Sequence, residues 1–337
     1  MTITADDGVI DLLGQAIGAL AGRAPYQAIA ERLRGLQAEL LDASDEIRRD
    51  VLQMAMESGI NWIDTAASYG KGQSEEVVGW LLKELPDNKR PQVSTKFAVD
   101  PNGGDYVGQI RRSLDQSLRR LQMESVSLLQ LHNQIGKDSH QLPLNEILRS
   151  DGVLDALDQI RSEGLTTFVG FTALGDAVSC REVVQSGRID TAQVYYNLIN
   201  PSAGYDIKAT WHSENYTGLL KTCRQFGVGV LAIRVYAAGI LASRVQHGRE
   251  IPVTSNADYE SELKRADSVR NVLREVDGTD AQKALRFVLD QDHIDGAVIG
   301  LAELSHLQEA IGATQLDSLS SSIMERLKNL WDRNYQE

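Results

Sequence analysis

Short apolar runs alternate with longer stretches of helical periodicity along most of this chain. An apolar run of four to eight residues bounded by polar or turn residues is typical of a buried strand, and spacing near 3.6 is typical of an amphipathic helix. The predicted strands are 61–64, 92–96, 127–131, 166–171, 191–195, 228–233 and 296–299. The predicted helices are 74–85, 105–121, 151–162, 176–186, 215–226, 256–276, 280–290, 303–312 and 320–334, the first with Ser74 as its N-cap.

The N-terminal part departs from this regular alternation. Residues 12–20 are apolar and rich in glycine, which predicts a first strand, and helical patterns follow at 26–41 and 43–58. A simple β/α repeat needs one helix there, so residues 1–58 form an atypical, helix-rich beginning.

Counting that first strand, the repeat reaches eight strands, all of the kind that is buried on both faces of a parallel sheet. We therefore expect an α/β fold, a parallel (β/α)8 TIM barrel formed by one domain over residues 1–337. An open, doubly wound sheet is the alternative. It is disfavoured because no Gly-x-Gly-x-x-Gly pattern follows a predicted strand.

Charge and composition exclude several classes of partner. The net charge of -13 disfavours nucleic acid and anionic membranes. No apolar run is long enough for a transmembrane helix, and Asp6, Asp7 and Asp11 do not suit a signal peptide. Cys180 and Cys223 form no metal-ligand pattern and are expected to be reduced thiols, as in a cytoplasmic protein. The oligomeric state is left open.

Four side chains follow or end successive strands in the first half of the chain. Asp64 ends one strand, Tyr69 lies in the loop behind it, Lys96 ends the next strand, and His132 follows the one after. In a barrel such residues converge on one mouth. A neighbouring ammonium favours the phenolate form of a tyrosine, so Lys96 would make Tyr69 a usable proton donor or acceptor. Asp64 would hold Lys96, and His132 would orient the reacting oxygen.

This order and spacing resemble the signature of the aldo-keto reductase superfamily, from about Asn61 to the C-terminal helices. The resemblance implies a (β/α)8 barrel that binds a nicotinamide cofactor without a Rossmann fold. It implies that Asp64, Tyr69, Lys96 and His132 are the catalytic tetrad and that Gln193 contacts the nicotinamide amide.

Further cofactor positions carry over less evenly. Thr172 keeps one hydrogen-bonding group where relatives show a Ser-Asn pair, and Ala173 replaces the second. Ile233 or Arg234 takes the place of an aromatic residue that usually stacks on nicotinamide. Gly239 matches a glycine of the pyrophosphate-side loop, and Gly300 begins the cofactor loop after the last strand. Glu303 stands where NADP-dependent members carry a basic residue; it would repel a 2′-phosphate and bond a free ribose hydroxyl. We therefore expect NAD or NADP, with a slight preference for NAD.

The resulting hypothesis is a cytoplasmic NAD(P)-dependent oxidoreductase. It would transfer a hydride between nicotinamide and a carbonyl or alcohol of a small aldehyde, ketone or sugar, with Tyr69 as general acid or base. Residues 15–22 are only loosely similar to the family's first loop. That departure and Ala173 keep open a non-redox lyase, dehydratase or isomerase built on the same tetrad. A third hypothesis is a non-catalytic binding or regulatory subunit on this fold, which the intact tetrad disfavours. No metal is predicted.

Overall fold

The computed structural model describes residues 28–29, 44–207, 211, 213–243, 259–300 and 304–335. Its strands form one eight-stranded sheet in which sequence order and spatial order agree. Every recorded pairing between neighbours is parallel. The strands are β1 (Ala28–Ile29), β2 (Trp62–Asp64), β3 (Gln92–Phe97), β4 (Val126–Leu131), β5 (Thr166–Ala173), β6 (Thr191–Tyr195), β7 (Gly229–Ile233) and β8 (Gly296–Ala297).

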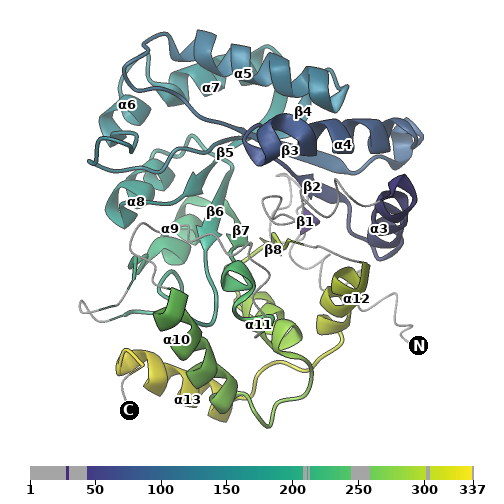
Figure 1. Ribbon diagram of the computed structural model, residues 1–337. Helices are drawn as coiled ribbons and strands as arrows, with labels where there is room; N and C mark the ends of the chain where they lie inside the picture. The colour runs from purple at the N-terminus through teal and green to yellow at the C-terminus, as the bar shows by residue number, and fades with distance from the viewer. Residues whose placement is uncertain are drawn as a thin grey trace.

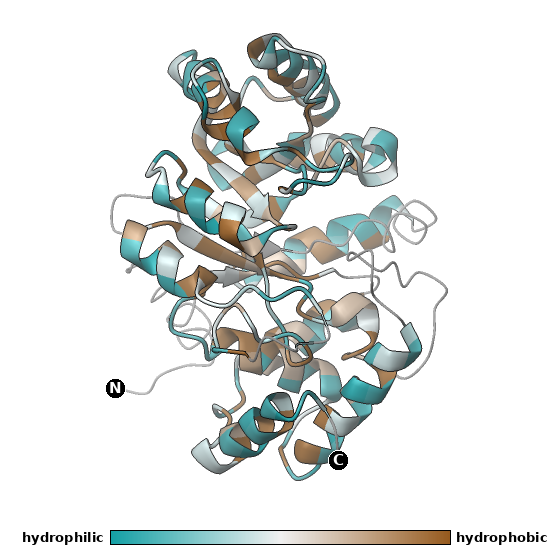
Figure 2. Cartoon of the chain, turned by 90° about the vertical axis from the view of Figure 1, so that its left-hand side faces the viewer, coloured by the Kyte–Doolittle hydropathy of each residue, from teal (hydrophilic) through white to brown (hydrophobic). Residues whose placement is uncertain are grey.

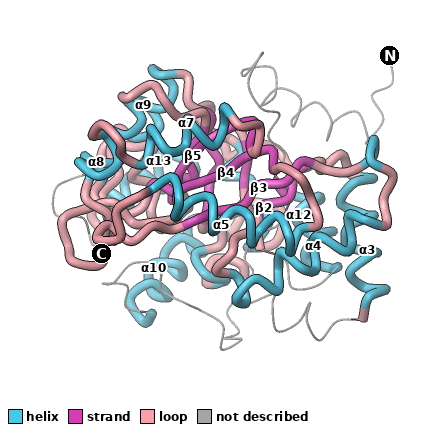
Figure 3. Tube along the Cα trace, turned by 90° about the horizontal axis from the view of Figure 1, so that it is seen from above, coloured by secondary structure: helices cyan, strands magenta, loops and turns pink. Residues whose placement is uncertain are grey.

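Helices separate the strands and lie around the sheet (Figures 1 and 3). They are α3 (Asp45–Glu57), α4 (Gln73–Lys83), α5 (Tyr106–Leu121), α6 (Leu144–Leu148), α7 (Val153–Ser162), α8 (Ala177–Gln185), α9 (Leu219–Phe226), α10 (Tyr259–Val272), α11 (Asp280–Leu289), α12 (Leu304–Ala313) and α13 (Ser321–Asp332). Short 3-10 turns are η1 (Tyr69–Gly72), η2 (Asp87–Lys89) and η3 (Ala237–Gly239). This is the predicted parallel (β/α)8 barrel.

The core explains why the strands read as continuous apolar runs. In β4, Leu128 and Leu129 are both fully buried although their side chains point to opposite faces of the sheet. One face packs inside the barrel and the other against the helices, and each fully buried leucine contributes about 1.5–3 kcal/mol. Figure 2 shows hydrophobic segments along the strands in the middle of the molecule and hydrophilic stretches on the surrounding helices.

Three details differ from the sequence-based expectation. Strand β1 lies inside the stretch predicted as the helix 26–41, whereas the strand predicted within 12–20 lies outside the described residues. A two-residue strand leaves no periodic signal. Its place is set by pairing, since Ala28 aligns with Trp62 and Ile29 with Ile63. The short helix α6 lies in a stretch predicted as loop.

The third difference concerns the start of α4. Ser74 is not its N-cap, because the helix begins at Gln73 and the cap is Gly72, with a positive φ of 97°. The Ser74 hydroxyl is buried and instead hydrogen-bonds Thr65 Oγ1 at 2.7 Å. A tertiary contact with the end of β2 therefore takes the side chain that local sequence assigned to the cap.

Candidate active site

A buried ion pair joins the ends of β2 and β3. Asp64 aligns with Ser94 in the sheet, which places Lys96 one pleat beyond it on the same face. The Lys96 Nζ atom lies 2.5 Å from Asp64 Oδ2, and neither side chain is exposed to solvent. A buried charge of this kind is tolerated because it is paired and hydrogen-bonded.

Lys96 also reaches the turn that follows β2. Its ammonium donates to the Thr65 carbonyl at 3.0 Å and to the Tyr69 hydroxyl at 3.1 Å. The same nitrogen lies 4.8 Å from the centroid of the Tyr69 ring. Because Tyr69 is half-buried, its hydroxyl connects this buried ammonium with the partly exposed end of the site.

The backbone of η1 turns the chain back beneath Tyr69. Lys71 and Gly72 both have positive φ, at 57° and 97°. A Cβ atom at Gly72 would stand 2.6 Å from Arg120 Cδ, so this turn needs a glycine for both its conformation and its close approach. The turn therefore fixes the direction from which Tyr69 meets Lys96.

His132 completes the group from β4. Its backbone N–H donates to the Phe97 carbonyl at 2.8 Å, continuing the β3–β4 ladder one residue past the strand. Its ring stands edge-on to that of Tyr69, with centroids 5.9 Å apart and planes at 88°. The structure thus brings Asp64, Tyr69, Lys96 and His132 together at the carboxyl ends of β2, β3 and β4.

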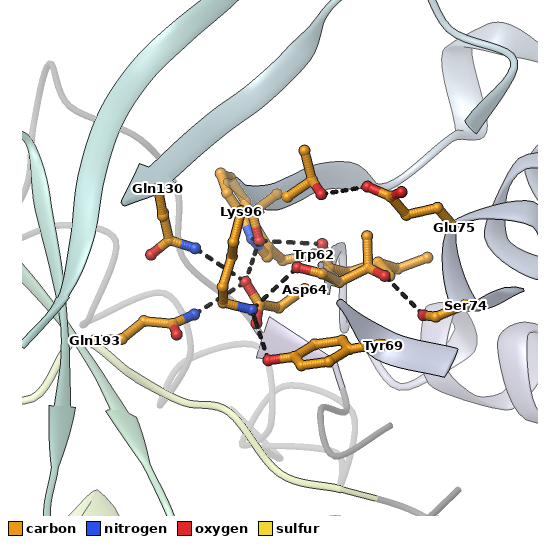
Figure 4. Close-up of polar contacts among 12 residues, drawn as sticks. Trp62, Asp64, Tyr69, Ser74, Glu75, Lys96, Gln130 and Gln193 are labelled. Carbon is orange, nitrogen blue, oxygen red and sulfur yellow. Dashed lines mark hydrogen bonds and ion pairs between the residues drawn. The ribbon is translucent and has the colours of Figure 1, made fainter. Parts of the chain in front are cut away.

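The second oxygen of Asp64 is held by neutral donors (Figure 4). Asp64 Oδ1 accepts from Gln130 Nε2 at 3.1 Å, from Gln193 Nε2 at 2.9 Å and from the Ser94 hydroxyl. Sequence reasoning missed Ser94 and Gln130. The available signal was a polar side chain inside an otherwise apolar strand. Gln193, expected at the nicotinamide amide, donates here to the tetrad aspartate.

A second buried acid fixes α4 against the barrel. Glu75 accepts from Thr95 Oγ1 at 2.5 Å and from Arg120 Nε at 2.7 Å, and it is fully buried. It therefore ties the helix after Tyr69 to α5 and to β3, the strand that carries Lys96.

The residues proposed for the cofactor lie at the ends of later strands. Thr172 aligns with Gln193 across β5 and β6. The Thr172 hydroxyl is buried and, within the part of the chain that the structure describes, has no hydrogen-bond partner. An orphaned hydroxyl beside an amide fits a ligand that supplies the missing hydrogen bond, such as a carboxamide. Ala173 offers no such group.

The loop after β7 presents backbone rather than side chains. Arg234 has a φ of 63°, and its carbonyl accepts from Asn197 Nδ2 at 2.8 Å. Gly239 has a φ of 97°, and a Cβ there would meet no atom of the described residues within 4 Å. The buried Arg270 of α10 braces the loop by donating to the Ile240 and Ser243 carbonyls. This geometry suits close approach of a phosphate group.

The remaining predicted positions are less informative. Gly300 follows β8 and is partly exposed. Glu303 lies outside the described residues, as does the first loop at 15–22. Among the described residues, no cluster of His, Cys, Asp and Glu suits a metal ion, and no helix there is long and apolar enough to cross a membrane.

Comparison with known proteins gives a consistent result. The sequence profile of the Aldo/keto reductase family matches residues 36–332. The chain is 28% identical over 292 residues to an L-galactose dehydrogenase of Arabidopsis thaliana, covering 82% of this chain and 83% of the relative. It is 27% identical over 321 residues to an L-glyceraldehyde 3-phosphate reductase of Escherichia coli K12, covering 85% and 86%.

Solved structures show the same fold at low sequence identity. The holo form of an aldo-keto reductase from Bacillus halodurans superposes with a TM-score of 0.64 at 20% identity, over 87% of this chain and 91% of that one. An aldo/keto reductase from Klebsiella pneumoniae, solved in complex with NADP and acetate, gives 0.61 at 22% identity over 86% of each chain.

Proposed function

Because the chain belongs to the aldo/keto reductase family and is an oxidoreductase, we propose that Asp64, Tyr69, Lys96 and His132 catalyse NAD(P)-dependent interconversion of a carbonyl and an alcohol. The observation that carries this proposal is the contact of the buried Lys96 ammonium with the Tyr69 hydroxyl at 3.1 Å. A phenol with an ordinary pKa near 10 is a weak acid at neutral pH, and a neighbouring cation favours its anion.

Each residue has a distinct part in the proton transfer. In reduction, Tyr69 donates its hydroxyl proton to the substrate oxygen as the carbonyl becomes an alcohol; in oxidation it accepts that proton. Lys96 stabilises the phenolate form of Tyr69 by placing its ammonium beside the Tyr69 oxygen. Asp64 holds Lys96 in place through the 2.5 Å ion pair. His132, edge-on to Tyr69, lies where it can hydrogen-bond the same substrate oxygen and orient the carbonyl.

A bound nicotinamide cofactor would supply or accept the hydride in this reaction. Thr172 and Gln193 would hold its carboxamide, because the Thr172 hydroxyl is buried and lacks a partner among the described residues. The η3 loop at Gly239 would border the phosphates, with Arg234 and Gly300 beside the same path. The preference for NAD rests on the carboxylate of Glu303, which would repel the 2′-phosphate of NADP.

The substrate class follows from the chemistry of the site. The tetrad acts on one oxygen and one carbon, so a small aldehyde, ketone or sugar suffices. The relatives named for L-galactose and L-glyceraldehyde 3-phosphate make sugars and sugar phosphates the first compounds to test.

The direct test removes one oxygen atom. Tyr69→Phe should lower kcat by about 10²–10⁴-fold, the usual share of a general acid, while the Kd for NADH or NADPH changes little. The matched control is Tyr106→Phe on α5, which should leave kcat unchanged. It removes a hydroxyl that donates a hydrogen bond to the Glu146 carboxylate at 2.7 Å. Near-full turnover by Tyr69→Phe would refute the mechanism.

Cofactor choice is tested separately by titrating the protein with NADH and NADPH. Tighter binding of NADH, reversed by Glu303→Lys, is the expected result. Tighter NADPH binding in the unaltered protein would refute the role given to Glu303. Turnover without formation or consumption of NAD(P)H would instead support the lyase, dehydratase or isomerase reading.

A further inference from the structure

We propose that Gln130 is a positioning residue for proton transfer by Tyr69. Its side-chain amide holds Asp64 in place, so that Asp64 stays paired with Lys96 and the Lys96 ammonium stays directed at the Tyr69 hydroxyl. The proposal rests on the function proposed above but concerns a residue outside the tetrad. It arises from a polar side chain inside the barrel that packing alone does not explain.

Gln130 lies where a barrel normally places a hydrophobic residue. It aligns with Lys96 across β3 and β4 and is fully buried, and its neighbours Leu129 and Leu131 are buried leucines. Asp64, Gln130 and Gln193 come from β2, β4 and β6, the alternate strands that contribute to one interior layer of a (β/α)8 barrel. In this layer the two glutamine amides donate to one oxygen of the aspartate, where apolar side chains would otherwise pack.

The orientation of the Gln130 amide is set by its charged neighbour. Its Nε2 donates to Asp64 Oδ1 at 3.1 Å, and the opposite orientation would set two oxygens against each other. This orientation leaves the carbonyl oxygen of the same amide unsatisfied. Gln130 Oε1 is buried without a hydrogen-bond partner among the described residues. A leucine or methionine would fill this space without an unpaired carbonyl, so the donor to Asp64 is what glutamine adds.

The effect of that donor on the site follows from its charge balance. Asp64 uses Oδ2 for Lys96, whereas its Oδ1 accepts from Gln130, Gln193 and Ser94. These donors offset part of the carboxylate's negative charge. Less of the Lys96 positive charge is then cancelled at the Tyr69 oxygen, and the phenolate is favoured.

Among the described residues, the charged and titratable groups around Tyr69 lie on β2 and β3 and directly after β4. Lys96 and His132 contact Tyr69, and Asp64 lies behind Lys96. Removal of the Gln130 donor should therefore make Tyr69 harder to ionise. A purely structural role would lower stability without moving the ionisation.

The test is an ultraviolet difference titration of tyrosine ionisation in the unliganded protein, with Tyr69→Phe defining the Tyr69 signal. The background is favourable because burial raises the pKa of Tyr195, Tyr196 and Tyr216. Gln130→Met keeps the length of the side chain and removes the donor. We expect it to move the Tyr69 midpoint upward by about half a pH unit to one unit. The full effect of a hydrogen bond to a charged group is about one to two units, and only part of it reaches Tyr69 because Gln130 acts through Asp64 and Lys96.

Four further variants sharpen the result. Gln193→Met removes the other amide from the same oxygen, and the double variant with Gln130→Met should shift the midpoint further than either single change. Gln130→Asn keeps the amide but shortens its reach, and decides the question if Gln130→Met does not fold. Gln159→Met is the control, since Gln159 donates to the carboxylate of Glu163 at 3.1 Å on the exposed side of α7. It should leave the midpoint in place.

An unchanged midpoint in Gln130→Met, or in Gln130→Asn if that variant has to replace it, overturns the proposal, even if the protein melts at a lower temperature. The titration needs neither cofactor nor substrate. It therefore decides the role of Gln130 whether or not the proposed oxidoreduction is found. Where turnover is measurable, the alkaline limb of the pH profile of kcat should move in the same direction as the midpoint.

Discussion

The Asp64–Lys96 pair offers the sharpest test of how this site is built, because its two members are supported unequally. When Lys96→Met removes the ammonium, Asp64 keeps its three neutral donors on Oδ1. When Asp64→Asn removes the carboxylate, Lys96 keeps the Thr65 carbonyl and the Tyr69 hydroxyl, and it meets an amide group in place of an anion. Counting the partners that the described residues supply, the cation is therefore left with less compensation than the anion.

The magnitude follows from the burial of both charges. Breaking a buried ion pair by removing one partner costs about 3–5 kcal/mol. We expect Lys96→Met near the lower end of that range and Asp64→Asn near the upper end. For a chain of 337 residues, the entropy of unfolding is about 0.7 kcal/mol/K, so the melting temperature should fall by about 4–7 °C. The double variant should lose clearly less than the sum of the two, because it leaves no unpaired charge.

Urea unfolding of the four proteins gives the free energies and the coupling between the two sites. In the same variants kcat should fall, because Tyr69 loses either its cation or the group that holds the cation. The reasoning would be refuted if the free energy of unfolding of each single variant lay within about 1 kcal/mol of the parent's and the loss in the double variant equalled the sum of the two single losses. Such a result would mean that water reaches the pair.

Three other expectations concern residues around the site. Burial raises the pKa of Cys223 to about 12 and also raises the pKa of Cys180, whereas an unfolded thiol ionises near pH 8.5. The thiols of the folded protein should therefore resist alkylation at pH 8. Because only the unfolded chain loses these protons, the free energy of unfolding should decrease as pH rises above about 8.5. Arg120→Met should cost about 3 kcal/mol in urea unfolding, since it leaves the fully buried Glu75 without its ion-pair partner at 2.6 Å. Gly72→Ala should lower both stability and kcat, because its φ is 97° and the new methyl group would stand 2.6 Å from Arg120 Cδ.

Matched controls separate these effects from general damage. Gly187 also has a positive φ, of 67°, but no atom lies within 4 Å of its Cβ position, so Gly187→Ala measures backbone strain alone and should spare kcat. Arg112 pairs with Asp105 at 3.9 Å on the surface, so Arg112→Met should cost less than about 1 kcal/mol. Rapid alkylation of the folded protein at pH 8, or equal losses in each matched pair, would contradict the structural reading.

Much of the fold was determined locally. Apolar runs that end at Asp64, Lys96 and Leu131 carry enough β-branched and leucine residues to form buried strands, and helical periodicity between them leaves few alternatives to a parallel sheet with covered faces. The order of the tetrad residues along the chain was readable for the same reason, since each follows or ends its own strand. These features depend on spacing within one segment, which a sequence displays directly.

Other features exist only because distant segments meet. The strand β1 is defined by its pairing with β2. The Ser74 hydroxyl, predicted to cap a helix, instead hydrogen-bonds Thr65. In the sequence Gln130 is a polar residue in an apolar strand and Gln193 is predicted to contact the nicotinamide amide, yet both donate to one oxygen of Asp64, across 66 and 129 residues of sequence. Barrel closure brings alternate strands into one layer, and hydrogen bonds across that layer leave no periodic trace in the chain. The sequence by itself determined which residues to propose for the chemistry; the tertiary structure decided which residues hold them in place.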